Sequence, residues 1–139
     1  MAANPYSTRA YQTTAVDTSD RNHQVVLLFD AAVCFLYQAR VGMEIGNYHA
    51  HCEGILRTQR ILSALMMALD KEIGGELAEH LFGLYNWLHH TLTEASIADD
   101  LALLGEALAV IKSLRDAWRQ AEQNLRSGQA EATEQPRAA

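Results

Sequence analysis

The sequence predicts an all-α fold, an antiparallel up-down-up-down four-helix bundle with an N-terminal flap segment. Both prolines, Pro5 and Pro136, lie near the ends of the chain, so no proline between them removes a helical backbone hydrogen bond. Apolar residues recur in alternating steps of three and four through four successive segments, which is the spacing of one helix face. Short breaks separate these segments, and short connections make consecutive helices antiparallel neighbours.

The four expected helices cover approximately residues 18–45, 47–72, 76–95 and 99–126. Thr18 or Ser19 can cap the first helix, because a hydroxyl oxygen accepts a hydrogen bond from the free N–H groups of the first turn. Asn47 follows the break at Gly46 and can cap the second helix in the same way. The sequence therefore supplies starting signals for the first two helices.

Glycine supplies the expected stops. Gly74 and Gly75 are expected to end the second helix and Gly128 the fourth, because glycine readily adopts the left-handed conformation that closes a helix. Residues 96–99 are expected to form a tight turn. These breaks divide the chain into a flap segment (1–17), a four-helix bundle (18–127) and a small polar tail (128–139) that we expect to be disordered.

Each helix carries an apolar stripe that is expected to pack into the core at a shallow crossing angle. The stripes are Val25, Phe29, Ala32, Leu36, Ala39 and Met43 in the first helix, Ile55, Leu62, Leu65 and Leu69 in the second, Leu77, Leu81, Leu84 and Leu88 in the third, and Leu101, Leu104, Leu108, Ile111 and Trp118 in the fourth.

Composition narrows the class of protein. A chain of 139 residues suits one domain and can bury a core without a metal or a disulfide. A formal net charge of −6 argues against nucleic-acid binding. Cys34 and Cys52 both fall in helical patterns and are interpreted as buried thiols in a reducing compartment. We find no signal peptide and no membrane-spanning apolar run, so the sequence predicts a cytosolic protein without a membrane span.

The first helix has more apolar surface than one core stripe requires. At about 100° per residue, Leu27, Cys34 and Val41 fall nearly opposite its core stripe, with Ala31 beside them. The fourth helix repeats this more weakly, since three of its residues also lie outside the main stripe: Leu103, Val110 and Ala117. We predict that these two sets of residues bind a partner.

Three arrangements could cover such a surface. Neighbouring helices could enclose the first helix, the N-terminal segment could lie on it through Tyr6 and Tyr11, or a partner chain could occupy the groove. The last two are compatible, because a weakly held flap can protect a groove and yield to a better ligand.

Catalytic and metal-binding patterns are not evident. His49 and His51 resemble metal ligands but lie about 200° apart on a helix, so they cannot share one ion. No pair of Glu-x-x-His motifs, phosphate-binding glycine loop or nucleophile elbow occurs. Asp30, an acid within an apolar run, is expected at a helix edge or in a buried pair. The sequence therefore predicts no enzyme, no metal and no cofactor.

The sequence resembles that of a known family, FliS, the export chaperones that hold flagellin before flagellar secretion. The resemblance covers residues 6 to about 122 in one order. It is carried by AYQ at Ala10–Gln12, LLFDAAVCFLYQA at Leu27–Ala39, ILSALMMALD at Ile61–Asp70, LFGLYNWLHHTLTEASIADD at Leu81–Asp100 and LRDAW at Leu114–Trp118. The chain departs from the family pattern at Phe29, where tyrosine is common, and at Ala31, where glycine is usual.

The resemblance implies a function. A FliS-like protein binds the disordered C-terminal region of flagellin in grooves of its bundle, prevents premature polymerisation and passes the client to the flagellar export gate. By matching position, Tyr11 and then Tyr6 are the expected flap residues. The alternative is a bundle whose extra apolar face forms a homodimer with a structural role. We expect the free protein to be a monomer or a weak dimer.

Overall fold

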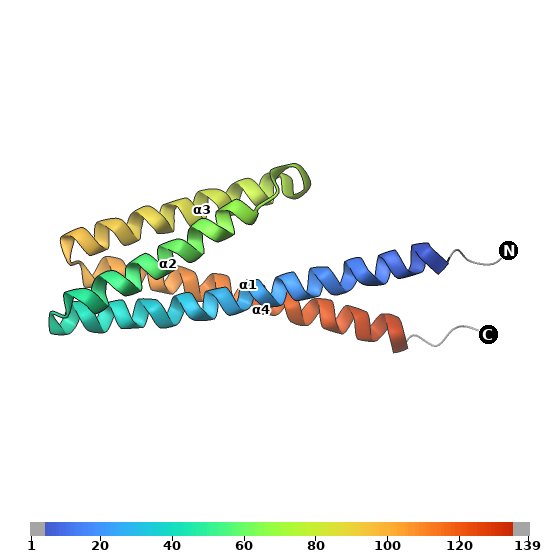
Figure 1. Cartoon of the computed structure of the whole chain (residues 1–139), viewed down its shortest axis with the longest axis horizontal. Coiled ribbons are helices and arrows are strands. Elements are labelled where there is room, and N and C mark those ends of the chain that lie inside the picture. Colours follow the sequence, from blue (N-terminus) through green and yellow to red (C-terminus); the bar gives the residue numbers. More distant parts are fainter. Residues whose placement is uncertain (1–4, 135–139) are drawn as a thin grey trace.

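Four helices make up the described part of the chain, which contains no strand. Figure 1 shows the computed structural model, which describes the backbone of residues 5–134 and the side chains of residues 20–128. The helices are α1 (Pro5–Ile45), α2 (Tyr48–Ala68), α3 (Lys71–Ala98) and α4 (Leu101–Glu134). α1 packs on α2 and α4, and α3 packs on the same two helices. The four helices therefore form a bundle in which helices that are consecutive in the chain are neighbours. The predicted all-α four-helix bundle is confirmed.

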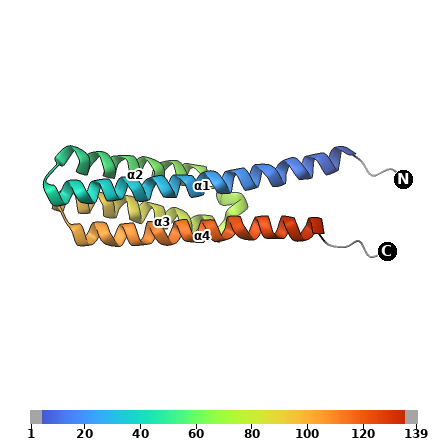
Figure 2. The same cartoon turned by 90° about the horizontal axis from the view of Figure 1, so that it is seen from below.

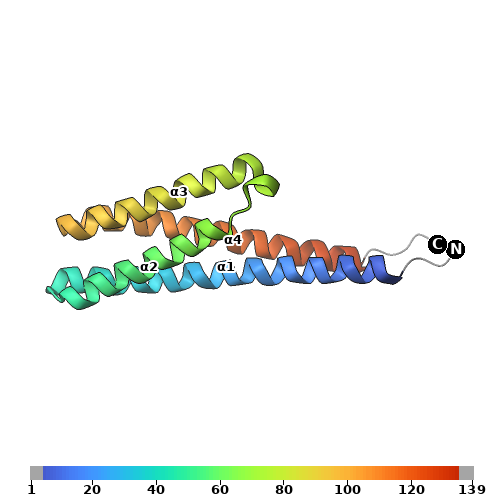
Figure 3. The same cartoon turned by 45° about the horizontal axis from the view of Figure 1, so that its top comes forward.

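The two ends of the bundle differ. The α1–α2 and α3–α4 turns lie at the same end (Figure 1). At the other end, the N-terminal part of α1 and the C-terminal part of α4 continue beyond the α2–α3 connection (Figure 2). The α2–α3 connection also diverges from α1 and α4 (Figure 3). All four helices therefore pack together only in the half of the bundle that contains the two turns.

The first turn forms as the sequence predicts. Gly46 has a positive φ of 75°, which favours glycine, and the chain reverses there. The Asn47 side chain then accepts a hydrogen bond of 3.1 Å from the backbone N–H of Ala50. The predicted cap of the second helix is confirmed.

The connection between α2 and α3 differs from the prediction. α2 ends at Ala68, and Asp70 caps α3 by accepting hydrogen bonds from the backbone N–H groups of Glu72 and Ile73. The expected stop at Gly74 and Gly75 is partly right: α2 already ends before these glycines, but Gly75 (φ 54°, ψ −131°) is non-helical and kinks the chain where the third helix was expected to begin. The Asp70 carboxylate starts a turn of helix four to five residues upstream of the glycines, and Gly75 then interrupts it.

The outer helix ends also extend further than predicted. α1 begins at Pro5 rather than near Thr18, because proline suits the first turn and no later residue forbids helix. α4 passes through Gly128 to Glu134, since one glycine inside a helix costs only about 1 kcal/mol. The predicted disorder of the tail concerns residues 128–139, of which 135–139 lie outside the described residues.

The core forms from the inward faces of all four helices. The predicted stripe of α1 is confirmed from Phe29 to Met43, and Val25 is half-buried. In α3 the prediction is partly wrong, because Leu77 is exposed. The buried residues of α3 are Ala78, Tyr85, Leu88, Thr91, Leu92 and Ala95. Leu77 follows the kink at Gly75 by two residues and is 67% exposed, and this end of α3 diverges from α1 and α4 (Figure 3).

Close approach of α1 and α2 depends on Gly54. A Cβ at this position would lie 2.3 Å from the carbonyl oxygen of Phe35. We expect Gly54→Ala to lower the free energy of unfolding by about 1–3 kcal/mol, because the two helices must separate. Gly83→Ala is the control, since nothing lies within 4 Å of its Cβ, and it should stabilise by up to about 1 kcal/mol. Urea unfolding measures both, and an unchanged Gly54→Ala variant would contradict this packing.

Candidate partner-binding surface

An apolar stripe runs along the outer side of α1. Leu27 and Val41 are each 52% exposed, Cys34 is exposed, and Ala31 is half-buried between them. Ile45 is the next residue in the same spacing and is also exposed. We call these five residues the outer stripe. The set predicted from the sequence ended at Val41, although Ile45 follows at the same helical spacing of four residues.

The neighbouring helices cover the flanks of α1 but not this stripe. Val26 and Val33 are buried, and Leu28 and Phe35 are half-buried. Enclosure of α1 on every side, one of the three arrangements considered, is therefore wrong for the described residues. The interpretation of both cysteines as buried is also wrong, because Cys34 lies on the outer stripe and Cys52 is only half-buried.

Charged groups border the stripe along the α1–α4 seam. The Arg119 guanidinium donates to the Asp30 carboxylate at 2.7 Å, and Arg115 approaches the same carboxylate at 3.9 Å. Nearby, the Lys112 ammonium donates to the Tyr37 hydroxyl. Asp30 thus lies at a helix edge, one of the two predicted positions, and it is not buried: its side chain is 36% exposed.

The same seam continues towards the end of the bundle opposite the two turns. His23 Nδ1 lies 2.8 Å from the carboxylate of Glu122, which also accepts a hydrogen bond of 2.8 Å from Arg126. Glu122 is buried, so these two partners compensate the cost of removing its charge from water.

A second charged border lies towards α2. The Arg57 guanidinium is 5.3 Å from the ring centroid of Phe35 and donates to Glu53 at 2.7 Å. That hydrogen bond lowers the pKa of Glu53, so the pair stays ionised at neutral pH. Arg40 and Glu44 form another pair at 3.2 Å, but Glu44 is seven residues from Tyr37, so this pair lies on the α4 side of the stripe. The outer stripe is thus an apolar centre between polar margins, the usual composition of a protein-binding site.

The weaker predicted set on α4 belongs to another face. Leu103 and Val110 are half-buried and pack against the core, and Ala117 is exposed. The α4 residues that reach α1 include Lys112 and Arg119, and Val110 and Ala117 lie about 200° away from them on the helix. The two predicted sets therefore do not form one groove.

The predicted flap residues, Tyr6 and Tyr11, lie outside the residues whose side chains are described. The backbone of residues 5–17 continues α1 away from α2 and α3 (Figure 1). A contact of these tyrosines with the outer stripe stays a prediction.

Exposed apolar residues also occur where sequence reasoning did not place a site. Met67, Ile73 and Leu77 are exposed near the α2–α3 connection, and Tyr48 and Ile97 are exposed at the other end of the bundle. Of these, Leu77 was assigned to the core because its spacing fits the α3 template, and spacing cannot reveal that the helix end diverges.

The candidate metal motif has another role. His51 is buried, and its Nε2 lies 2.9 Å from the Ser96 hydroxyl oxygen, whereas His49 is exposed. Within the described residues, no group of three or more His, Cys, Asp or Glu side chains is placed to hold a metal ion. His51 instead hydrogen-bonds between α2 and α3.

The segment Asp20–Ile45 of α1 is long and apolar enough to cross a membrane by length and composition. The expectation that the chain has no such apolar run is therefore wrong. The reason is that α1 carries both a core face and the outer stripe, which together make most of its circumference apolar. A buried bundle helix passes the same test, and α1 packs on two neighbours and pairs Asp30 with Arg119.

These features define a small all-α bundle whose distinctive surface lies outside, on α1, and not in an internal cavity. The family model described as "Flagellar protein FliS" matches residues 2–125. The flagellar secretion chaperone FliS of Bacillus subtilis is 28% identical over 88% of this chain and 90% of its own length. FliS of Salmonella typhimurium is 31% identical over 81% and 87%, and FliSB of Pseudomonas aeruginosa is 34% identical over 79% and 90%. The chain belongs to the FliS family of flagellar secretion chaperones, which confirms the resemblance found in the sequence.

Proposed function

We propose that this protein binds the disordered C-terminal region of flagellin in the cytosol, prevents its premature polymerisation and delivers it to the flagellar type III export apparatus. The observation that carries the proposal is the outer stripe, an apolar surface with charged margins on a chain of the flagellar chaperone family. The role is one of binding, and no catalytic step is proposed.

The stripe suits a helical client. From Leu27 to Ile45 it extends about 27 Å, which is the length of a helix of about 18 residues. An amphipathic client helix can place its apolar side chains against the stripe and its polar side chains near the charged margins. Because a disordered client loses entropy as it orders, its net affinity stays moderate, which suits later release at the export gate.

The direct test is isothermal titration of the full chain with the C-terminal segment of the flagellin from the same organism. We expect measurable heat, one bound segment per chain and co-elution of the pair on a sizing column. No heat together with no co-elution would refute the proposal. If the free protein instead sediments as a dimer at every concentration and buries the outer stripe, the homodimer is the better explanation.

The flap leads to a separate prediction. If residues 5–17 leave the helical extension of α1 and fold back over the outer stripe, deletion of residues 1–17 is expected to raise client affinity and the fluorescence of the dye ANS, because a covering segment is removed from apolar surface. Tyr6→Ser with Tyr11→Ser should reproduce part of both changes. If affinity and fluorescence match those of the full chain, residues 1–17 do not cover the binding surface.

A further inference from the structure

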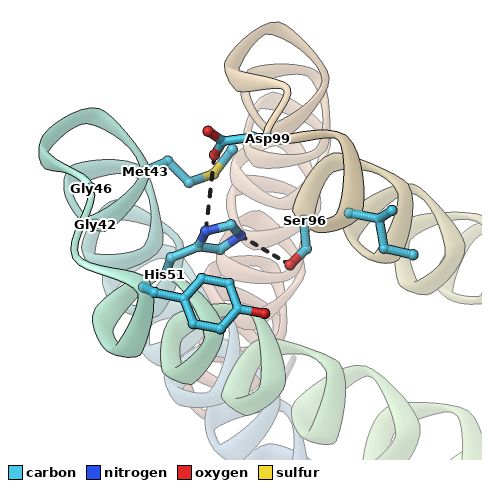
Figure 4. A pocket seen from close by; sticks show the side chains of 8 residues that line it. Gly42, Met43, Gly46, His51, Ser96 and Asp99 are labelled. Carbon is cyan, nitrogen blue, oxygen red and sulfur yellow. Dashed lines mark hydrogen bonds and ion pairs between the residues drawn. The ribbon is translucent and has the colours of Figure 1, made fainter.

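A pocket lies at the end of the bundle where the α1–α2 and α3–α4 turns meet. Figure 4 shows this pocket, with Gly42, Met43 and Gly46 on one side and Ser96 and Asp99 on the other. Its volume is about 260 Å³. The outer stripe ends at Ile45, next to Gly46 of the pocket wall, but none of the stripe residues lines the pocket. No role described above uses it.

His51 holds the two walls of the pocket in place. Its side chain is 5% exposed, and Nε2 lies 2.9 Å from the Ser96 hydroxyl oxygen (Figure 4). Its Nδ1 lies 4.0 Å from the Asp99 carboxylate. Gly42 permits this arrangement, since a Cβ there would come within 2.5 Å of the His51 backbone nitrogen. The pocket is therefore built where the two turns meet, and the contacts of His51 hold its walls together.

Two exposed apolar residues form part of the rim of the pocket. Ile97 is 83% exposed, and Tyr48 is exposed with its ring edge against His51 at a centroid distance of 5.6 Å. Exposed apolar side chains around a concave site are typical of surfaces that bind another polypeptide. Small-molecule sites usually enclose about 300–1,000 Å³, so this pocket is small for a cofactor and has room for one large side chain.

Asp99 gives the rim its charge. It has a left-handed backbone (φ 51°, ψ 44°), which is uncommon outside glycine, and its side chain is 68% exposed. The neighbouring carboxylate of Asp100 caps α4 by accepting from the Leu103 N–H at 3.0 Å. Among the described contacts, the Asp99 carboxylate has only the 4.0 Å approach to His51. It can therefore pair with a cation that a ligand brings.

We propose that this pocket binds one large apolar side chain of a partner polypeptide that carries lysine or arginine beside it. The apolar side chain enters between Met43, Tyr48 and Ile97, and the basic side chain pairs with Asp99. This site is separate from the flagellin surface of the proposed function, and its test does not use flagellin.

The test uses blocked heptapeptides in a Gly-Ser background, titrated at millimolar concentration into the full chain and followed by amide NMR shifts. The first peptide has one leucine between a lysine and an arginine. We expect it to shift amides of residues 42–51 and 96–99. Replacing its leucine by alanine should weaken binding about tenfold, because apolar burial is lost. Replacing its two basic residues by glutamate should weaken it several-fold, because Asp99 is 68% exposed and water screens the pairing. Equal binding of the three peptides, or no shift with the first, overturns the proposal.

Protein variants locate the binding. Asp99→Asn keeps a residue that tolerates the left-handed conformation and should remove the preference for basic over glutamate-containing peptide. Ile97→Ser should weaken the first peptide several-fold. Ile73→Ser is the matched control, because Ile73 is 88% exposed at the opposite end and should leave binding unchanged. A preference that survives Asp99→Asn, or equal losses in Ile97→Ser and Ile73→Ser, contradicts the assignment to this pocket.

Discussion

A variant with both Leu27→Asp and Val41→Asp is expected to bind the C-terminal flagellin segment at least about a hundredfold more weakly than the unchanged chain. Each substitution removes an apolar contact and places a carboxylate without a partner under the bound client. A hundredfold loss corresponds to about 2.7 kcal/mol, which two such changes readily supply. Isothermal titration measures the affinity.

The fold should tolerate both changes. Leu27 and Val41 are each about half exposed and lie outside the core, so the free energy of unfolding should fall by no more than about 1 kcal/mol. The matched control is Met67→Asp with Ile73→Asp, which adds the same charge to exposed apolar residues at the α2–α3 end. We expect this control to bind the client normally. If it loses affinity equally, net charge and not the outer stripe explains the effect.

An unchanged affinity of the Leu27→Asp, Val41→Asp variant would place the client elsewhere. The second predicted set, Leu103, Val110 and Ala117, lies on the side of α4 away from α1, and only Ala117 of the three is well exposed. That face exposes less apolar area than the outer stripe, because Leu103 and Val110 are half-buried against the core. The outer stripe is therefore the surface on which the proposed function is tested first.

Local spacing predicted α1 well because one period holds along its core face. Phe29, Leu36 and Met43 are seven residues apart and all buried, and Leu27, Cys34 and Val41 share the opposite face. Such facts follow from helix geometry, which is known before the fold. The start of α1 was missed because no residue before Thr18 either requires or forbids helix.

Contacts between distant residues could not be predicted. The pairing of Asp30 with Arg119 joins positions 89 residues apart, and the hydrogen bond of His51 with Ser96 joins positions 45 apart. A sequence pattern gives the face on which a residue lies, not the residue opposite it on another helix. The pairing of Asp30 with α4 and the pocket at the turns arise from such distant pairs, whereas Arg57–Glu53 and Arg40–Glu44 are pairs four residues apart on one helix.

The second large expected effect concerns the core. Leu36 is 0% exposed on the core face of α1, and Leu36→Ala leaves a cavity that tightly packed neighbours can fill only in part. We expect the free energy of unfolding to fall by about 2–5 kcal/mol. This is a large share of the roughly 5–15 kcal/mol that stabilises a typical domain. Urea unfolding followed by circular dichroism measures it.

Leu27→Ala is the control on the same helix, because it removes the same atoms from a side chain that is 52% exposed. Its stability should change by less than about 1 kcal/mol, whereas its affinity for the flagellin segment should fall several-fold. Leu36→Ala should do the opposite in conditions where it remains folded, with lower stability and nearly unchanged affinity. If Leu36→Ala and Leu27→Ala both lose stability and affinity together, the core and outer faces of α1 do not act independently. Client binding would then depend on the packing of the whole bundle.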